Sequence, residues 1–545
     1  MSAAQTSDER AAAEGDVDVH GDVDVLVVGA GPSGLLTACE LLRRGARVRV
    51  VDRAAEPSTT PKALSVWPRA LDILTDLGLG EAVDRESVPI TALSYFADRA
   101  PLARFELGPD VRCNTLPQHV TERLLTERLH ALGGKVERGV RLLALDGVDG
   151  AGGGAPPERV TALLLREDGA VERAQASYVV GADGAGSAVR GQLGVGFEGS
   201  TYEMAFALVD GRIDGDLPPD ETLFYQGANG ALVIVPLPGG VFRFLSIMPP
   251  GQAGVTVPMM QAIIDDRGPA GVVLREAVWQ AVFRVHARVA TSFHRNRVFL
   301  VGDAAHVHSP AGGQGMNNGL QDAHNLAWKL AAVLRGDSPA SLLDSYDHER
   351  REVTARILRD TDLQTRAWVV NTPAATAVRD SLFRFGERSG AVSRYYAPVM
   401  AGRRIAYHPV RRTQRPSGFA LCRAREHKPG AVRVGGVLPR GFALSTGIGG
   451  EAADPHAWVL LLNARPGDRT WLAVVDQLVA SRPRVASRLV EDRGGFACGR
   501  TGYVLVRPDG HVAAHGHRGD LDRLAAELDT AFGPAPRVEP GAGAG

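Results

Sequence analysis

The run of residues 24–34 constrains the fold of this chain more than any other feature. It reads Asp-Val-Leu-Val-Val-Gly-Ala-Gly-Pro-Ser-Gly, an apolar strand followed by a glycine turn and a segment with apolar residues at helical spacing. Gly29 suits the tight turn, Gly31 lets the backbone approach a phosphate, and Gly34 allows the helix to pack closely on the sheet. The helix N-terminus then offers N–H groups to an anion. With Asp52 placed to bond a ribose hydroxyl, the pattern predicts a dinucleotide-binding βαβ unit and leaves FAD and NAD both open.

Two further segments also join a short apolar strand to a glycine turn. One spans Tyr178–Arg190, and the other spans Val298–His306 and runs into a glycine loop at Pro310–Asn318. With the three motifs in this order, the chain resembles the single-component, FAD-dependent aromatic hydroxylases related to para-hydroxybenzoate hydroxylase. Within that family it looks most like the bacterial polyketide hydroxylases. The resemblance covers residues 22 to about 407 well and the rest of the chain more loosely.

The resemblance implies a set of residues that bind FAD. Asp303 would bond the ribityl or ribose part, the turn at Asp183 would support the pyrophosphate region and a visiting nicotinamide nucleotide, and Gln118 would lie beside the flavin. Arg69 matches a basic position near the FAD and the active-site entrance, as Arg53 and Lys62 do. The set expected at the cofactor is Gly29, Gly31, Pro32, Ser33, Gly34, Asp52, Arg53, Lys62, Gln118, Asp183, Gly302, Asp303, Pro310, Gly313, Gly315, Met316 and Asn317.

The segment after the third motif is expected to place a helix N-terminus at the flavin. Residues 317–334 carry apolar side chains at helical spacing, and Gly336 would end the helix. Its dipole and the loop N–H groups would stabilise the negative charge of the reduced flavin. Two positions depart from the family pattern. Asp52 stands where Glu is commoner, which shortens the reach to the ribose, and Ser309 stands where Pro is commoner, which leaves the loop less constrained.

Composition disfavours several other classes of protein. The chain has 545 residues, is 44% hydrophobic and carries a formal net charge of −1, which fits a large cytoplasmic enzyme and gives no basic stripe for nucleic acid. It has no apolar run of about 18 residues for a membrane span, and residues 1–21 look like a disordered tail and not a signal peptide. The histidines lack the spacing of a metal site. No C-x-x-C pair supports a disulfide reductase, since the cysteines are Cys39, Cys113, Cys422 and Cys498.

The expected fold class is α/β, with three domains. A Rossmann-like FAD-binding domain with a helical extension would comprise residues 22–200 and 291–400, and an inserted mixed β-sheet substrate domain residues 201–290. A C-terminal thioredoxin-like α/β domain would comprise residues 425–535 and, without a cysteine pair, would serve for interaction or bracing. Within the helical extension, Glu349–Glu352 are expected on a solvated face.

The resemblance also implies the reaction. NADPH or NADH would reduce FAD, dioxygen would form a flavin C4a-hydroperoxide, and its distal oxygen would pass to an aromatic carbon, with a polycyclic polyketide as the implied substrate. The partners would therefore be an aromatic small molecule and dioxygen, with the protein as a monomer or homodimer. A general base would help to activate a phenol, and the candidates are Tyr225, Arg243 and His308. The candidate substrate contacts are Phe224, Val235, Pro236 and Phe244.

Two other functions remain compatible with the same motifs. The flavin could insert oxygen differently, by Baeyer–Villiger cleavage or epoxidation, because these reactions share the intermediate and differ in the electronics and pose of the substrate. The chain could also be a flavoprotein that binds an aromatic ligand without turnover. Ligand-stimulated NADPH oxidation separates such a binding protein from an enzyme that hydroxylates or otherwise inserts oxygen.

Overall fold

The three predicted strands that precede glycine turns are neighbours in one sheet of the computed structural model. The structure describes residues 19–149, 157–227, 229–249, 252, 254–370, 372–408, 432–465, 467–482, 484–490 and 501–534. Parallel pairing joins β2 to β1, β1 to β11 and β11 to β18. The sheet order is β17-β18-β11-β1-β2-β8, with β10 on β11 and β9 on β10. Because the carboxyl ends of parallel strands meet at one edge of a sheet, the three turns converge there. The bounds are β1 (Val19–Val28), β2 (Val48–Asp52), β8 (Val136–Arg138), β9 (Arg141–Asp146), β10 (Val160–Leu165), β11 (Val171–Gly181), β17 (His294–Arg295) and β18 (Val298–Leu300).

Of the expected disordered tail, residues 1–18 lie outside the described residues, and β1 begins at Val19, inside the range that the sequence assigned to the tail. The strand is longer than its apolar run because His20 and Val23 pair with β11 across an irregular register.

Two helices that follow glycine turns pack against each other, and the first of them also contacts the sheet. The helix α2 begins at Pro32, directly after the first turn. The helix α8 corresponds to the predicted helix 317–334: it begins two residues earlier, at Gly315, and ends at Leu334 as predicted. Their contact fills the core with fully buried side chains such as Leu35, Leu36 and Leu320. The helices of this part are α2 (Pro32–Leu42), α3 (Pro68–Asp76), α4 (Gly80–Glu86), α5 (Gln118–Ala131), α6 (Ala188–Gln192) and α8 (Gly315–Leu334).

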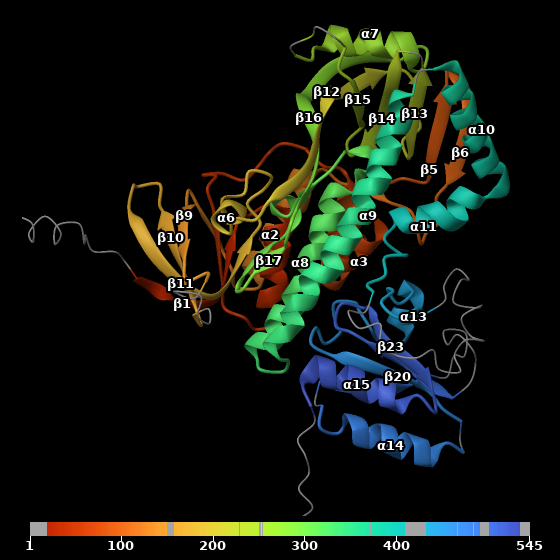
Figure 1. The fold of residues 1–545 in the computed structure, drawn as a ribbon. Coiled ribbons are helices and arrows are strands. Elements are labelled where there is room, and N and C mark those ends of the chain that lie inside the picture. Colours follow the sequence, from red (N-terminus) through yellow and green to blue (C-terminus); the bar gives the residue numbers. More distant parts are fainter. Residues whose placement is uncertain are drawn as a thin grey trace, which may run out of the picture.

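A second sheet stands above the first and has one face under α7 (Figure 1). Its order is β19-β16-β12-β15-β14-β13-β5-β6. The predicted hairpin of residues 231–248 is confirmed, since β14 and β15 pair antiparallel around a turn at Pro238–Gly240. The hairpin of β5 and β6 comes from residues 92–106, which the sequence had assigned to the FAD-binding domain, and pairs with β13. The bounds are β5 (Ala92–Ala97), β6 (Ala100–Glu106), β12 (Phe197–Asp214), β13 (Glu221–Gly227), β14 (Gly230–Leu237), β15 (Val241–Ile247), β16 (Val273–Ala290), β19 (His306–Val307) and α7 (Val257–Arg267).

The segment after α8 is helical, as its pattern predicts. The helix α9 contacts β14 and β16, and α10 contacts β6, so this segment closes the side of the second sheet that faces away from α7 (Figure 1). Among the described residues, no helix is both long enough and apolar enough to cross a membrane. The bounds are α9 (Asp344–Val369), α10 (Pro373–Ser389), a π-helical turn (Val392–Tyr396) and α11 (Ala397–Met400).

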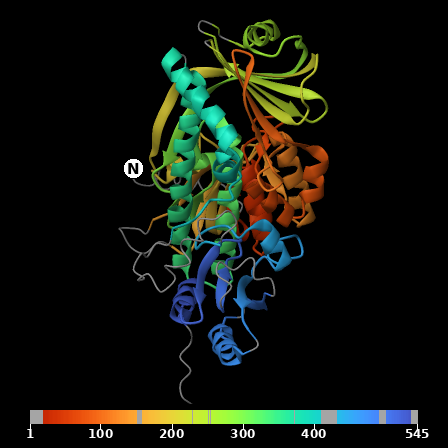
Figure 2. The ribbon, with the colours of Figure 1, turned by 90° about the vertical axis from the view of Figure 1, so that its right-hand side faces the viewer.

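The C-terminal part forms a four-stranded sheet of order β21-β20-β22-β23 with helices beside it. Both views place it at the end of the molecule opposite α7 (Figure 1, Figure 2). Trp328 of α8 packs edge-on against Trp458 of β20, with ring centroids 5.7 Å apart. The thioredoxin-like character of this domain stays a prediction, and Cys422 and Cys498 lie outside the described residues. The bounds are α13 (Arg440–Ser445), β20 (Trp458–Asn463), α14 (Arg469–Val479), β21 (Val485–Leu489), β22 (Gly502–Val506), β23 (Val512–His517) and α15 (Leu521–Phe532).

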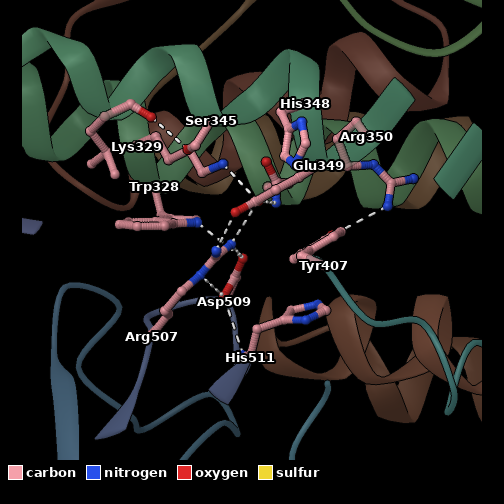
Figure 3. A network of polar contacts seen from close by, with 12 residues as sticks. Trp328, Lys329, Ser345, His348, Glu349, Arg350, Tyr407, Arg507, Asp509 and His511 are labelled. Carbon is pink, nitrogen blue, oxygen red and sulfur yellow. Dashed lines mark hydrogen bonds and ion pairs between the residues drawn. The ribbon is translucent and has the colours of Figure 1, made fainter. Parts of the chain in front are cut away.

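A buried network of charged side chains joins α8 and α9 to the β22–β23 turn (Figure 3). Glu349 pairs with Lys329 at 2.8 Å and with Arg507 at 2.5 Å, and Arg350 pairs with Asp322 at 2.7 Å. The expectation of a solvated face at Glu349–Glu352 is therefore wrong for its first two residues, which are 6% and 0% exposed. The C-terminal domain covers Glu349, and the side chain of Arg350 points inward to Asp322 of α8.

Candidate functional site

One cavity of about 1330 Å³ runs from the three glycine turns to the underside of the second sheet. Pockets that hold one small ligand usually measure roughly 300–1,000 Å³, so this cavity has room for a dinucleotide and a second molecule. It is lined by most residues of the predicted cofactor set, namely Gly29, Gly31, Pro32, Ser33, Asp52, Arg53, Lys62, Gln118, Asp183, Asp303, Pro310, Gly313, Gly315 and Met316.

The first turn has the shape that a pyrophosphate needs. A Cβ built on Gly31 meets no atom within 4 Å, and this residue lines the cavity with an ordinary φ of −77°. Gly29 has φ +109°, and a Cβ there would lie 2.3 Å from the carbonyl oxygen of Ala182. A Cβ on Gly34 would lie 2.0 Å from the carbonyl oxygen of Gly29. Gly31 thus leaves space for a ligand, whereas Gly34 serves helix–strand packing and does not line the cavity, so the residues present fit FAD.

Asp52 holds the first turn in addition to facing the cavity. Its Oδ2 accepts a hydrogen bond of 2.6 Å from the Ala30 N–H, and its Oδ1 accepts one of 2.8 Å from the Ala54 N–H. The shorter side chain at this position therefore reaches the turn itself, which sequence reasoning did not foresee.

Asp303 is the acidic group of the third motif that faces the cavity. It follows β18 in a 3₁₀ turn, Gly302–Ala304, and it lines the cavity. Enclosure by the surrounding protein raises its pKa, while His306 and Lys62 act in the opposite direction. Such a carboxylate can accept a hydrogen bond from a ribityl or ribose hydroxyl. Gly302 stands behind it with φ +59°, where a Cβ would lie 2.5 Å from Ser33 Oγ.

Replacing Asp303 by Asn is expected to raise the Kd for FAD about tenfold. Hydrogen bonds to a charged group contribute roughly 1.5–3 kcal/mol, and about 1.4 kcal/mol corresponds to a factor of ten. Titration of the apoprotein with FAD, followed by quenching of flavin fluorescence, measures the change. Asp84→Asn, at an exposed position of α4, is the control. Equal affinities of the two variants would remove Asp303 from the cofactor site.

The loop of the third motif is fixed from α8. The Asn317 side chain accepts a hydrogen bond from the Trp67 N–H at 2.7 Å and donates to the carbonyl oxygens of Ser65 and Gly313, each at 2.8 Å. Trp67 Nε1 donates to the Gly312 carbonyl at 2.9 Å. Asn317 therefore holds the loop and does not line the cavity. Sequence reasoning missed Trp67 because its partners lie far along the chain.

A buried acid of α8 supports the same loop from beneath. Asp322 accepts hydrogen bonds from the Gly302 N–H at 3.0 Å and lies 2.6 Å from His306 Nε2. It also pairs with Arg350. Burial alone would raise the pKa of Asp322, but His306 and Arg350 lower it below the usual value. Asp322 is the one acid of α8, and this was the available signal in the sequence for the support.

The three candidate bases have different surroundings. His308 lines the cavity, its Nδ1 lies 3.0 Å from the Ser309 carbonyl, and its Nε2 has no hydrogen-bond partner in the described part of the chain. Burial, with a smaller contribution from His306, lowers its pKa to about 4. It is thus neutral near pH 7, where Nε2 accepts a hydrogen bond. Arg243 is held by Asp210 at 2.6 Å and by the Lys62 carbonyl at 2.6 Å, and a guanidinium is no base.

Tyr225 is corrected as a candidate. Its ring stacks on Phe96 at 4.4 Å, in the core between the second sheet and α7. Successive residues of a strand point to opposite faces, and the neighbouring position Phe224 takes the cavity face.

The substrate candidates divide in the same way. Phe224 and Val235 line the cavity, whereas Pro236 does not. Phe244 is fully buried in the core under α7. The cavity also has an aromatic wall that sequence reasoning missed, because it comes from β5, β6 and the helical segment. Its members are Tyr95, Phe105, Trp368, Phe383 and Tyr396.

Arg69 does not reach the cavity. Its Nη2 donates to the carbonyl oxygen of Asp509 at 2.5 Å, in the β22–β23 turn. The basic residue expected near the active-site entrance therefore tethers α3 to the C-terminal domain.

Comparison with known proteins places these features in context. The family model described as "FAD binding domain" matches residues 22–361. The chain is 34% identical to 6-methylpretetramide 4-monooxygenase of Streptomyces rimosus, over 95% of each chain. Its fold is similar to the solved structure of the anhydrotetracycline hydroxylase OxyS of Streptomyces rimosus, with a TM-score of 0.73 and 29% identity over 95% of this chain and 100% of that one. It is also similar to CabE, an aromatic hydroxylase from angucycline biosynthesis, with a TM-score of 0.69 and 28% identity over the same shares.

Proposed function

The chain belongs to the FAD binding domain family and is an FAD-dependent monooxygenase of the aromatic hydroxylase type, and we propose that NAD(P)H is its reductant and a polycyclic aromatic polyketide its substrate. By their names, two of the relatives above act on 6-methylpretetramide and anhydrotetracycline, and the third comes from angucycline biosynthesis. The proposal carries the fused-ring character of those substrates over to this chain.

The observation that supports the proposal most is the continuity of the cavity. It extends without a dividing wall from the space beside Gly31 to the aromatic side chains of the second sheet, such as Phe224. A substrate held against these aromatic side chains would lie in the same cavity as the cofactor. The wall itself is rich in aromatic rings, with Tyr95 stacked on Phe224 at 4.5 Å, and this surface suits the faces of fused aromatic rings.

The cofactor, when bound, supplies the redox chemistry: it accepts two electrons from the nicotinamide nucleotide and activates dioxygen. The turn at Gly31 and the helix α2 would hold its pyrophosphate, and Asp303 would hold its ribityl chain. Arg243 ties the second sheet to the backbone at Lys62 and so fixes the distance between substrate wall and cofactor. Once cofactor and substrate fill the cavity, they would exclude water from the reacting centre.

His308 would assist by accepting a hydrogen bond from the substrate. Its Nε2 has no hydrogen-bond partner among the described residues and belongs to a side chain that lines the cavity. A hydrogen bond from a substrate phenol to this atom would raise the electron density of the ring, which favours attack on an electrophilic oxygen.

The test is a screen of NADPH and NADH oxidation by the purified holoenzyme against aromatic polyketides, with mass spectrometry of the products. We expect a fused-ring phenol to stimulate oxidation and to gain one oxygen atom on an intact ring. Ring expansion or an epoxide would instead establish the alternative oxygen insertion. No stimulation by any compound, with none changed, would show a binding protein and contradict the proposal.

A further inference from the structure

The strand β13 presents three side chains to the cavity. Thr222, Phe224 and Gln226 all line it, whereas Leu223 and Tyr225 belong to the core on the α7 side of the same strand. This division follows from the alternation of side chains along a strand. Gln226 is the last of the three and lies beside the hairpin turn that ends β13.

Gln226 is a buried amide that the described part of the protein leaves without a partner. Its side chain is 3% exposed, and neither its Oε1 nor its Nε2 has a hydrogen-bond partner there. Buried polar side chains are nearly always hydrogen-bonded, because an unmet donor or acceptor is costly. An apolar residue at this position would avoid the cost, so the amide indicates a ligand that completes it.

The position of Gln226 lies at the end of the cavity that is remote from the cofactor turns. At about 3.3 Å per residue, its four-residue separation from Thr222 spans roughly 13 Å of strand. At the other end, Val235 of β14 pairs with Arg243, which is bonded to the Lys62 carbonyl near the cofactor turns. Between the two ends stand aromatic rings, including Phe224, whose centroid lies 6.3 Å from that of Trp368.

The cavity therefore has a polar end near the cofactor, an aromatic middle and the Gln226 amide at its far end. An amide offers a donor and an acceptor side by side in one plane, and its complement is a group that does the same, such as a carboxamide. A site that hydrogen-bonds a substrate group rejects an analogue without it far more strongly than an apolar pocket can.

We propose that Gln226 forms a binding subsite for a carboxamide-like group at the edge of the aromatic substrate that lies farthest from the flavin. The inference rests on the proposed function, since it assumes that an aromatic molecule occupies this cavity. Gln226 would set the orientation of the substrate and hence the ring position that meets the cofactor, without touching the reacting atoms.

The first test compares two naphthols that differ at the far edge, 6-hydroxy-2-naphthamide and 6-methyl-2-naphthol. Their binding to the oxidised holoenzyme is followed by the change in flavin absorbance, which needs no turnover. We expect the carboxamide to bind about tenfold more tightly, as two added hydrogen bonds suggest. The preference should vanish in Gln226→Leu and persist in Gln192→Leu, a control at an exposed position outside the cavity. Equal Kd values in the unmodified enzyme, a preference that survives in Gln226→Leu, or binding of neither probe would overturn the proposal.

The second test is the stability of the holoenzyme without substrate. Because Gln226→Leu removes an unpaired buried amide, we expect its Tm to rise by about 2 °C. A fall in Tm would mean that the protein itself holds the amide, and it would overturn the subsite. The wider screen of NADPH oxidation judges the proposed function separately, since stimulation by aromatic compounds with no role for Gln226 would leave that function standing.

Discussion

Gly31→Val is expected to abolish FAD binding while the protein still folds. The Cβ position of Gly31 opens into the cavity with nothing within 4 Å, and its φ of −77° is one that any residue adopts. The Cβ of a valine would therefore meet no protein atom within 4 Å, and the side chain would take up the space of the pyrophosphate. We expect the Kd for FAD to rise at least about 100-fold, or roughly 3 kcal/mol. The loss in stability should be limited to about 1 kcal/mol, for a poorer helix N-cap.

The measurement is the ratio of flavin to protein absorbance after purification and dialysis against excess FAD, together with the far-ultraviolet circular dichroism spectrum. Gly108→Val is the matched control, because this glycine is exposed and its Cβ would also meet nothing within 4 Å, but it does not line the cavity. A Gly31→Val protein that retains stoichiometric FAD would refute the placement of the pyrophosphate.

Glu349→Gln is expected to destabilise the protein by about 3–5 kcal/mol. Glu349 is 6% exposed and pairs with two cations, the buried Lys329 on α8 and the mostly buried Arg507 on the C-terminal domain. The amide would leave both cations close together without their shared carboxylate. Denaturant unfolding followed by tryptophan fluorescence reports the change, since Trp328 and Trp458 meet at this interface.

The control for this variant is Glu352→Gln, one turn further along α9. Glu352 is half-buried and pairs with Arg356 at 2.6 Å and with His408 at 2.8 Å. Both pairs are open to solvent, so their loss should cost no more than about 1 kcal/mol. Equal costs for the two glutamates would show that the interface does not depend on the buried network.

The pH dependence of the protein's stability follows in part from the Glu349 carboxylate. Arg507 and Lys329 outweigh the desolvation of Glu349 and lower its pKa from 4.5 to about 2. A group with a depressed folded-state pKa stabilises the protein above its unfolded-state pKa and loses that stabilisation as the pH falls. The difference in stability between the unmodified protein and Glu349→Gln should therefore be full above pH 4.5 and shrink toward pH 2. A difference that stays constant across this range would place the titration elsewhere.

The cofactor half of the site could be predicted from the sequence because each of its parts is local. A strand, a turn and a helix fit within residues 24–42, and the glycines mark the turn directly. The structure then shows what the motif cannot show, which is that Asp52 caps the turn and that Asn317 and Asp322 hold the third loop. These contacts join segments far apart in the chain, and no spacing rule connects them.

The substrate half and the domain interface were harder to predict for the same reason. The aromatic wall depends on the parallel pairing of β5 with β13, in which Tyr95 lies opposite Phe224. Nothing near residue 95 marks it as part of a sheet built mainly from residues after 196. Glu349 and Arg350 look like a solvated helix face in the sequence because the C-terminal domain that covers Glu349 follows much later in the chain.

The central claim is that a single enclosed cavity brings flavin-activated oxygen to an aromatic ring. The most direct test is one reaction of the purified holoenzyme under ¹⁸O₂ with NADPH and a substrate found in the screen, followed by mass spectrometry of the product. We predict one ¹⁸O atom on an intact aromatic ring, with none from water. A product whose new oxygen comes from water, or consumption of NADPH with peroxide as the only product for every compound that binds, would contradict it.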